Sequence, residues 1–328
     1  MEIKLVTNQA EWDGWLKNQP QCSFAQSWDW GEILKAEGRK VERAQFMEND
    51  KIFGAVQFIY NYALGFEYLF CPKGPVIKDS IINVFNAFQK YITDKGIVFL
   101  RCEPSDKNGL DDKSDFKKTI DINPRATSIL ELLQTEEEIL EKMHSKTRYN
   151  IRLAEKKNLT ISSEKNFEVF WRLMNETGKR DHFHLHEKRH YEEVFKSSIT
   201  KQFTATLEGK PVATVVLVGF NDTMTYLFGA SSYEQRQLMA PHLLQWEAIK
   251  LAKKEGYHYY DLFGIAPRKY GFSGTDYEYD EKHQYAGVTR FKLGFGGVVQ
   301  EQPGTYDLIV SSGKYKMYQA LRKLRRLV

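Results

Sequence analysis

The sequence is poor in cysteine and has no long apolar run, and each scarcity argues against a class of protein. Its three cysteines, Cys22, Cys71 and Cys102, are too few and too scattered for a disulfide framework or a structural zinc site. No run of 18 apolar residues occurs, which argues against a membrane-spanning helix. The first residues, 1–5, lack the basic-then-apolar order of a secretory signal, so we expect a cytoplasmic protein.

The net charge of the chain is also small, but its basic residues are unevenly distributed. The chain has 328 residues, of which 42% are hydrophobic, enough for one large or two ordinary folded domains and too many for a disordered chain. Its net charge is only +4, yet residues 142–157 hold six basic side chains with Glu141 and Glu155 beside them, and 308–328 hold six and no acid. Such stretches are most often solvated surface, but they also concentrate phosphate-bearing ligands.

Strand-like and helix-like segments alternate along the chain, which indicates a mixed α/β protein. Thr135 and Glu138 have the spacing of a capping box that opens a helix. Both halves have the order helix, antiparallel hairpin, third strand, helix, parallel strand. This order predicts an α/β (α+β) fold of two tandem acetyltransferase-like (GNAT-type) domains, 1–144 plus 304–328 and 145–303. The segments are strands at 52–60, 96–101, 203–207, 212–220, 224–229 and 257–263 and helices at 81–95, 167–178 and 243–256.

A coenzyme A site would need a glycine-rich turn before a helix, where backbone N–H groups meet the pyrophosphate. The matching segment, 235–241, contains no glycine and ends in Pro241, which has no N–H. The segment 78–80 in the first half lacks glycine as well. We therefore expect no coenzyme A and no other cofactor.

Six short segments resemble motifs of the Fem-type (FemA/FemB/FemX) aminoacyltransferases, and all six lie in that family's order. Any one alone is weak, but the ordered set spans nearly the whole chain and is specific. The family resembles two acetyltransferase-like domains in tandem, in agreement with the pattern above. The segments are Phe24–Gly31, Lys73–Val76, Ser145–Arg152, Ala240–Leu244, Tyr260–Gly264 and Phe291–Gly297.

The resemblance implies transfer of an amino acid from aminoacyl-tRNA to the side-chain amine of a peptidoglycan stem peptide. The acceptor would be UDP-MurNAc-pentapeptide or its lipid-linked form, lipid II, and a lipid-linked acceptor would place the enzyme at the inner face of the membrane. Longer members carry a coiled-coil hairpin in the second domain. Residues 164–200 hold no sustained heptads, so the chain resembles the shorter, FemX-like type.

The Phe291-Lys292 pair matches the place where the aminoacyl-tRNA terminus enters in FemX-like enzymes. There an ammonium can neutralise terminal phosphate and stabilise the oxyanion that forms when an amine attacks the ester. Phe291 can stack on the terminal adenine. Without the resemblance, Lys292 would be taken for an exposed strand lysine beside a core phenylalanine. We predict that these two residues carry the catalytic role.

The resemblance assigns the acceptor to five further residues, with departures from the family pattern. Family members place a lysine four residues after the motif tryptophan, but Leu34 stands there and Lys35 follows one position later. The strand tyrosine of the family matches Tyr226, whereas the next expected tyrosine is Phe228. These departures leave the identity of the acceptor open. The candidate acceptor residues are Lys35, Glu103, Arg180, Tyr191 and Tyr226.

Other interpretations remain open at this point. His182, His184 and His186 would share one face of a strand, a geometry suited to a metal, but the interleaved charged residues favour a polar loop, and we predict no metal site. The two basic stretches also fit a non-enzymatic RNA-binding protein, and the fold fits an aminoacyl-tRNA–protein transferase. The basic C-terminal helix, 315–327, offers a peripheral membrane contact, although docking on the first domain is the expected use.

Overall fold

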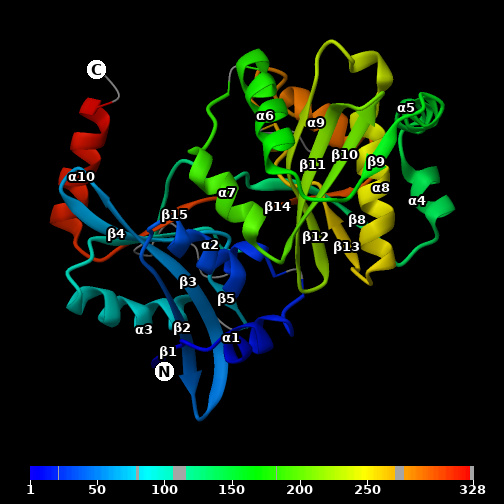
Figure 1. The fold of residues 1–328 in the computed structure, drawn as a ribbon. Helices are drawn as coiled ribbons and strands as arrows, with labels where there is room; N and C mark the ends of the chain where they lie inside the picture. Colours follow the sequence, from blue (N-terminus) through cyan, green and yellow to red (C-terminus); the bar gives the residue numbers. More distant parts are fainter. Residues whose placement is uncertain (21, 79–80, 106–115, 182, 270–276, 326–328) are drawn as a thin grey trace. The chain divides into compact units, whose positions relative to one another are not determined.

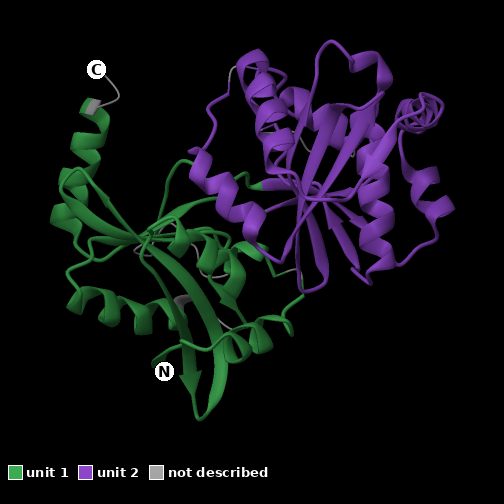
Figure 2. Cartoon of the chain, in the orientation of Figure 1, with its two compact units in different colours: residues 1–125, 302–328 green, residues 126–301 purple. Residues whose placement is uncertain are grey.

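The computed structural model describes residues 1–20, 22–78, 81–105, 116–181, 183–269 and 277–325. The chain divides into two compact units, Met1–Arg125 with Gln302–Val328 and Ala126–Glu301 (Figure 2). The first boundary lies earlier than the predicted one after His144. The reason is that residues 126–131 form a strand of the second unit's sheet, so the capping-box helix that follows them also belongs there.

The first unit is a mixed sheet in the order β1-β2-β3-β4-β6-β15-β7, with β5 paired to β3. Strands β4 and β6 are parallel, and β15 returns from the C-terminal segment to pair with both β6 and β7. The chain's last strand is therefore an internal strand of the first unit. The strands are β1 (Glu2–Leu5), β2 (Val41–Glu48), β3 (Lys51–Ala63), β4 (Phe66–Cys71), β5 (Val76–Ile77), β6 (Phe99–Cys102), β7 (Phe116–Lys118) and β15 (Tyr306–Ile309).

Helices cover this sheet with aromatic side chains. The predicted amphipathic helix is present as α3, and its Phe88 packs edge-on against Phe46 and Phe58 of the sheet. The C-terminal helix α10 packs Tyr315 and Tyr318 on Phe99, as expected for docking on the first domain. The helices are α1 (Gln9–Leu16), η1 (Phe24–Gln26), α2 (Trp28–Ala36), α3 (Ile81–Asp94) and α10 (Ser312–Arg325).

The second unit is a sheet in the order β14-β8-β13-β12-β11-β10-β9. Figure 1 shows α6 and α7 on one side of this sheet and α8 on the other. The elements are β8 (Ala126–Glu131), α4 (Glu136–Lys142), α5 (Ser145–Glu155), β9 (Thr160–Ser162), α6 (Phe167–Asp181), α7 (Lys188–Lys196), β10 (Thr200–Leu207), β11 (Lys210–Phe220), β12 (Thr223–Ser231), η2 (Arg236–Leu238), α8 (Ala240–Lys254), β13 (Tyr259–Asp261), α9 (Ala286–Leu293) and β14 (Val298–Glu301).

Strands β12 and β13 part from each other midway along β12. Their parallel pairing runs only from Thr223 to Thr225, and in the described pairing β12 continues to Ser231 bonded to β11 alone. A register shift between β11 and β12 lies just beyond Tyr226: Tyr226 pairs with Leu217 and Phe228 with Val216, so Leu227 has no partner in the pairing. The sheet therefore opens at Tyr226, where side chains from the ends of other elements can enter.

Two further expectations concern long helices. Within 164–200 the described residues form only α6 and α7, and no extended helical hairpin interrupts them, as predicted from the missing heptads. Among the described residues, no helix combines the length and apolar character needed to cross a bilayer.

Candidate active site

Lys292 lies on the helix α9, not on a strand, and its side chain is almost fully buried, with 7% of its surface exposed. Its Nζ donates hydrogen bonds to the backbone carbonyls of Phe263, at 3.0 Å, and Gly264, at 2.8 Å. Burial lowers the pKa of Lys292 to about 7, against a smaller opposing effect of the Asp261 carboxylate. A buried lysine that is half charged near neutral pH is a group suited to chemistry.

The two carbonyls are aimed by the turn after β13. Phe263 has a φ of 55°, in the left-handed region that a bulky residue rarely adopts. Its N–H donates to Oδ1 of Asp261 at 2.7 Å, and the hydroxyl of Thr127 donates to the same carboxylate oxygen. The segment Tyr260–Gly264 thus forms a strained turn, and two backbone carbonyls of this turn accept hydrogen bonds from Lys292.

Phe291 precedes Lys292 on α9, and its side chain packs against a different set of residues. Its ring meets His242 at 5.1 Å and Phe295 at 5.2 Å between centroids, both edge to face. Nε2 of His242 lies 3.2 Å from the side-chain amide of Asn150. Burial lowers the pKa of His242 to about 4, so this imidazole is neutral at pH 7.

Two glycines allow the chain at the end of α9 to approach the start of α5 and the end of α4. A Cβ on Gly294 would lie 2.4 Å from Oγ1 of Thr147, and one on Gly296, whose φ is 80°, would lie 2.2 Å from the carbonyl oxygen of Lys142. The N–H of His144 donates to the carbonyl of Gly294. The four family-like segments of the second unit therefore meet around Lys292.

Tyr226 belongs to the same place, at the opening between β12 and β13. Nζ of Lys292 lies 5.4 Å from the centre of its ring. Burial raises the pKa of Tyr226 to about 12, so the phenol stays neutral, and its hydroxyl fills the space above Gly229, where a Cβ would lie 1.9 Å away. Three of the predicted site residues, Phe291, Lys292 and Tyr226, are thus brought together.

Arg180 and Tyr191 lie apart from that group, on α6 and α7. Arg180 donates two 2.7 Å hydrogen bonds to Asp181 and one to the carbonyl of Ser231. It lines a cavity of about 860 Å³ together with Arg172 and Lys210. Tyr191 is 1% exposed in an aromatic cluster with Phe170 and Phe228, and burial raises its pKa. Its hydroxyl accepts a hydrogen bond from the N–H of His186.

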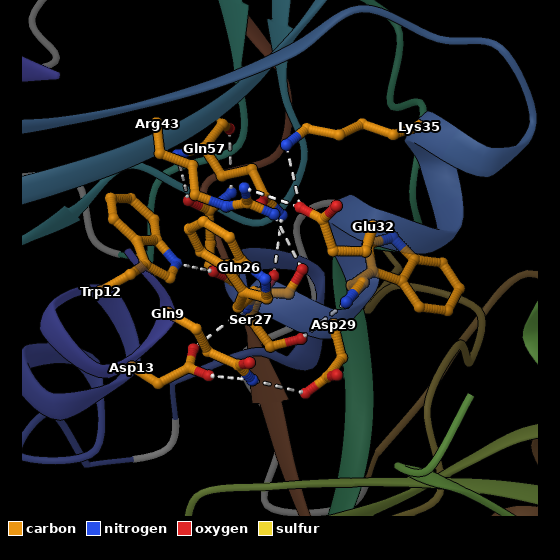
Figure 3. A network of polar contacts seen from close by, with 12 residues as sticks. Gln9, Trp12, Asp13, Gln26, Ser27, Asp29, Glu32, Lys35, Arg43 and Gln57 are labelled. Carbon is orange, nitrogen blue, oxygen red and sulfur yellow. Dashed lines mark hydrogen bonds and ion pairs between the residues drawn. The ribbon is translucent and has the colours of Figure 1, made fainter. Parts of the chain in front are cut away.

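Lys35 lies in the first unit at the edge of a polar network (Figure 3). Its Nζ is 2.9 Å from Glu32, which also pairs at 3.0 Å with Arg43. Burial works against ionisation of Glu32, but the hydrogen bond from Lys35 and the charge of Arg43 prevail and lower its pKa. Leu34, which has the position of the family lysine, is buried. Lys35 remains half exposed, where a ligand can compete with Glu32.

The same network shows what the first family-like segment does. The side chain of Gln26 is fully buried; it donates to the carbonyl of Pro72 at 2.7 Å and accepts from the N–H of Gln57. Arg43 donates to Gln57 and to the carbonyl of Trp28. Phe24–Gly31 is therefore joined by buried hydrogen bonds to the segment before Lys73–Val76 and to β3.

Glu103 is also buried and fully engaged within the first unit. Its carboxylate accepts hydrogen bonds from the N–H of Lys73, from both the N–H and the side chain of Asn123, and from the hydroxyl of Thr305. Arg101 pairs instead with Asp307. These bonds tie three loops together, and a role in holding the attacking amine stays a prediction.

The histidine-rich segment begins at His182, which lies outside the described residues. His186 and His190 face each other with ring centroids 4.6 Å apart. Within the part of the chain that the structure describes, no group of three side chains is placed to hold a metal ion.

Comparison with known proteins defines the class and then the family. The lipid II:glycine glycyltransferase of Staphylococcus epidermidis is 22% identical over 411 aligned positions, covering 98% of this chain and 96% of that protein, and that of Staphylococcus aureus is 21% identical over 416. Both alignments are longer than this chain, so these relatives contain segments that it lacks. The predicted class, a transferase enzyme, is confirmed.

The model described as the FemAB family matches residues 7–121, 113–203 and 196–323, and the chain belongs to this family. The crystal structure of FemX aligns with a TM-score of 0.81 at 20% identity over 97% of this chain and 99% of that one. A tandem GNAT protein from the clavulanic acid pathway aligns with a TM-score of 0.50 at 7% identity over 94% and 99%. The predicted fold of two tandem acetyltransferase-like domains is confirmed.

Sequence reasoning gave no role to several residues that build the site. Asn150, His242 and Asp261 stand inside the family-like segments, but their contacts come from elements far apart in the chain. Thr127 lies outside every segment, and nothing in the sequence marked it.

Proposed function

We propose that this protein transfers an amino acid from aminoacyl-tRNA to the stem-peptide amine of a peptidoglycan precursor, UDP-MurNAc-pentapeptide or lipid II. The observation that carries the proposal is Lys292, buried at the opening of the second sheet and held by two carbonyls. Membership of the FemAB family and the names of the staphylococcal relatives support the choice of a peptidoglycan acceptor.

The donor end would lie against Lys292 and Phe291. The two carbonyls use two of the three N–H donors of Lys292, which leaves one for a terminal phosphate or an oxyanion. A bound phosphate raises the pKa of a lysine, so donor binding would charge a group that is only half charged in the free protein. Phe291 offers a ring on which the terminal adenine can stack.

The reaction needs orientation more than covalent help. The acceptor nitrogen attacks the carbonyl carbon of the aminoacyl ester and the carbon–oxygen bond to the terminal ribose breaks. The proton lost by the attacking amine ends on the released ribose oxygen, which leaves as a hydroxyl. In the transition state, negative charge develops on the carbonyl oxygen of the ester. The Lys292 ammonium is already in place to stabilise this charge, so the site need not reorganise. The ring of Tyr226 lies beside Lys292, 5.4 Å from its Nζ, and burial raises the pKa of the phenol to about 12, so this neighbour carries no charge.

The acceptor has two candidate anchor points within the chain. Lys35 can exchange its pairing with Glu32 for a diphosphate, and Arg180 lines the 860 Å³ cavity together with Arg172 and Lys210. Each lies in a different unit. Both offer the cationic hydrogen-bond donors that a diphosphate requires.

A transfer assay tests the proposal. Purified protein is mixed with a pool of charged tRNAs and either UDP-MurNAc-pentapeptide or lipid II, and the acceptor is analysed by mass spectrometry. We expect an acceptor heavier by one aminoacyl residue, with the mass naming the amino acid. A product with lipid II alone would place the reaction at the membrane face.

Absence of product with both acceptors would contradict the proposed function. A protein substrate labelled from the same charged tRNA pool would then identify an aminoacyl-tRNA–protein transferase. The control is heat-denatured enzyme in the same mixture, because aminoacyl esters also react slowly with free amines.

A further inference from the structure

Helix α5 presents a basic stripe to solvent. Lys146, Tyr149, Arg152 and Lys156 are spaced by three or four residues, so they share one side of the helix. All four are exposed, as is Lys157 directly after the helix. Among the described residues, no ion pair or side-chain hydrogen bond is formed by any of the basic side chains of this stripe, Lys146, Arg152, Lys156 and Lys157. Within the part of the chain that the structure describes, the stripe is therefore a row of cations without counterions.

Arg148, on the same helix, is by contrast a cation with a structural role. Its guanidinium donates to the carbonyls of Glu141 and Met143, which closes the end of α4. The apolar side of α5 is also occupied, because Ile151 and Ala154 are buried and the helix packs on α8. The exposed basic residues have no such task in the fold.

The N-terminal end of α5 lies at the candidate active site. Asn150 contacts His242. Burial lowers the pKa of His242, and the positive charge of Lys146 lowers it further. From Lys146 the stripe continues along α5 to Lys156 and Lys157 at its C-terminal end. With a rise of about 1.5 Å per residue, α5 is about 16 Å long, enough to follow several phosphates of one strand. A ligand whose reacting end lies at Lys292 would meet this stripe next.

We propose that the basic stripe of α5, comprising Lys146, Arg152, Lys156 and Lys157 with Tyr149, binds the sugar-phosphate backbone of the donor tRNA next to its aminoacylated end. This inference rests on the proposed function, since it takes the donor to be an RNA. The four cations recognise phosphates, and Tyr149, 63% exposed between them, can stack on a base or a ribose.

An anionic membrane is the other partner that a basic helix can bind, and the structure favours RNA. A helix that lies in a bilayer surface needs an apolar face directed to the lipid. The apolar residues of α5 are turned inward, and Tyr149 is the only large apolar side chain exposed on the described helix. The stripe is thus suited to phosphates in water.

Binding of uncharged tRNA tests the surface without any assumption about catalysis. The variant combines Arg152→Gln, Lys156→Gln and Lys157→Gln and leaves Lys146 in place because it adjoins the site. The matched control combines Lys17→Gln, Lys51→Gln and Lys90→Gln, three exposed lysines of the first unit. We expect the α5 variant to bind at least about tenfold more weakly and to lower the slope of log K against log salt by about 2 to 3. The control should match the wild type.

A short donor distinguishes RNA binding at α5 from the transfer reaction at Lys292. With full-length aminoacyl-tRNA we expect the α5 variant to raise the donor KM. With aminoacyl-adenosine, which has no phosphate to place along α5, it should turn over like the wild type. An α5 variant that binds tRNA with the wild-type affinity and salt slope would overturn the inference. So would loss of binding to anionic vesicles with tRNA binding unchanged.

The two proposals fail in different ways. If no donor is used by the wild type but the α5 variant still loses tRNA binding, the transfer function is wrong and the RNA surface stands. If transfer occurs and the α5 variant equals the control with full-length donor, the transfer function stands and the surface is wrong.

Discussion

Lys292 owes its chemical character to its burial and to two backbone groups, the carbonyls of Phe263 and Gly264. Lys292→Met removes the charge but keeps most of the volume. We expect it to lower kcat by roughly 10²- to 10³-fold, the usual effect of losing one oxyanion-stabilising donor. Steady-state transfer kinetics measure this, with Lys254→Met, on an exposed lysine of α8, as the control. A change confined to the acceptor KM would contradict a role in the transition state.

The lowered pKa of Lys292 also links folding stability to pH. In the folded protein this lysine loses its proton near pH 7, whereas in the unfolded chain it keeps it to its ordinary value of 10.5. Between these values the unfolded state binds more protons, so stability rises with pH. Relative to Lys292→Met, the wild type should gain up to about 1.4 kcal/mol per pH unit above pH 7.

Urea unfolding of both proteins at pH 6, 7, 8 and 9 measures that difference. The difference should be flat below pH 7, because Lys292 is then protonated in both states. A wild-type advantage that shrinks as pH rises would mean that the folded protein stabilises the ammonium.

At the scale of single elements, most of the helices and strands could be predicted from local patterns. The capping box at Thr135 is present, and the helices expected at 81–95 and 167–178 were found within a few residues as α3 and α6. Their hydrophobic periodicity is local information. The strand expected at 96–101 begins only at Phe99, because its pairing is set by β15, far along the chain.

The candidate site could be predicted only in part, for a related reason. Lys292 and Tyr226 lie side by side, although the resemblance assigned them to different substrates. The burial of Lys292 was not foreseen, since it depends on a left-handed turn at Phe263 held by Asp261 and Thr127. Such a turn leaves no periodic pattern, and its partners are distant in sequence.

The glycines around α9 give an element-scale test. Gly296 has a φ of 80°, and a Cβ there would overlap the carbonyl oxygen of Lys142, whereas a Cβ on Gly287, inside α9, would meet nothing within 4 Å. Gly296→Ala should destabilise the protein by about 2 kcal/mol or more, through strain and displacement of α4. Gly287→Ala should stabilise it by up to about 1 kcal/mol.

Thermal unfolding followed by circular dichroism measures both variants. Because Gly296 adjoins the contact between α9 and α5, its variant should also lose activity at temperatures where it remains folded. Equal effects of the two substitutions would show that the close approach at Gly296 is not needed.

At the scale of the whole molecule, the first unit is completed by the last strand of the chain. Asp307 on β15 forms two hydrogen bonds with Arg101 on β6, and both side chains are buried. Burial disfavours a charged arginine, but the bonds to Asp307 outweigh it and raise the pKa of Arg101. The pair therefore joins the N-terminal and C-terminal parts of the first unit.

Asp307→Ala should destabilise the first unit by about 3–5 kcal/mol, since it leaves Arg101 buried without a counterion. Lys4→Ala, which breaks an exposed pair with Glu11 in the same unit, should cost less than about 1 kcal/mol. Hydrogen exchange read by mass spectrometry should show faster exchange in β6, β7 and β15 of the Asp307 variant. Residues 126–301 should keep wild-type rates, because their core contains neither residue. Equal acceleration in both units would mean that they unfold as one, and that the chain's division into two sheets is structural but not energetic.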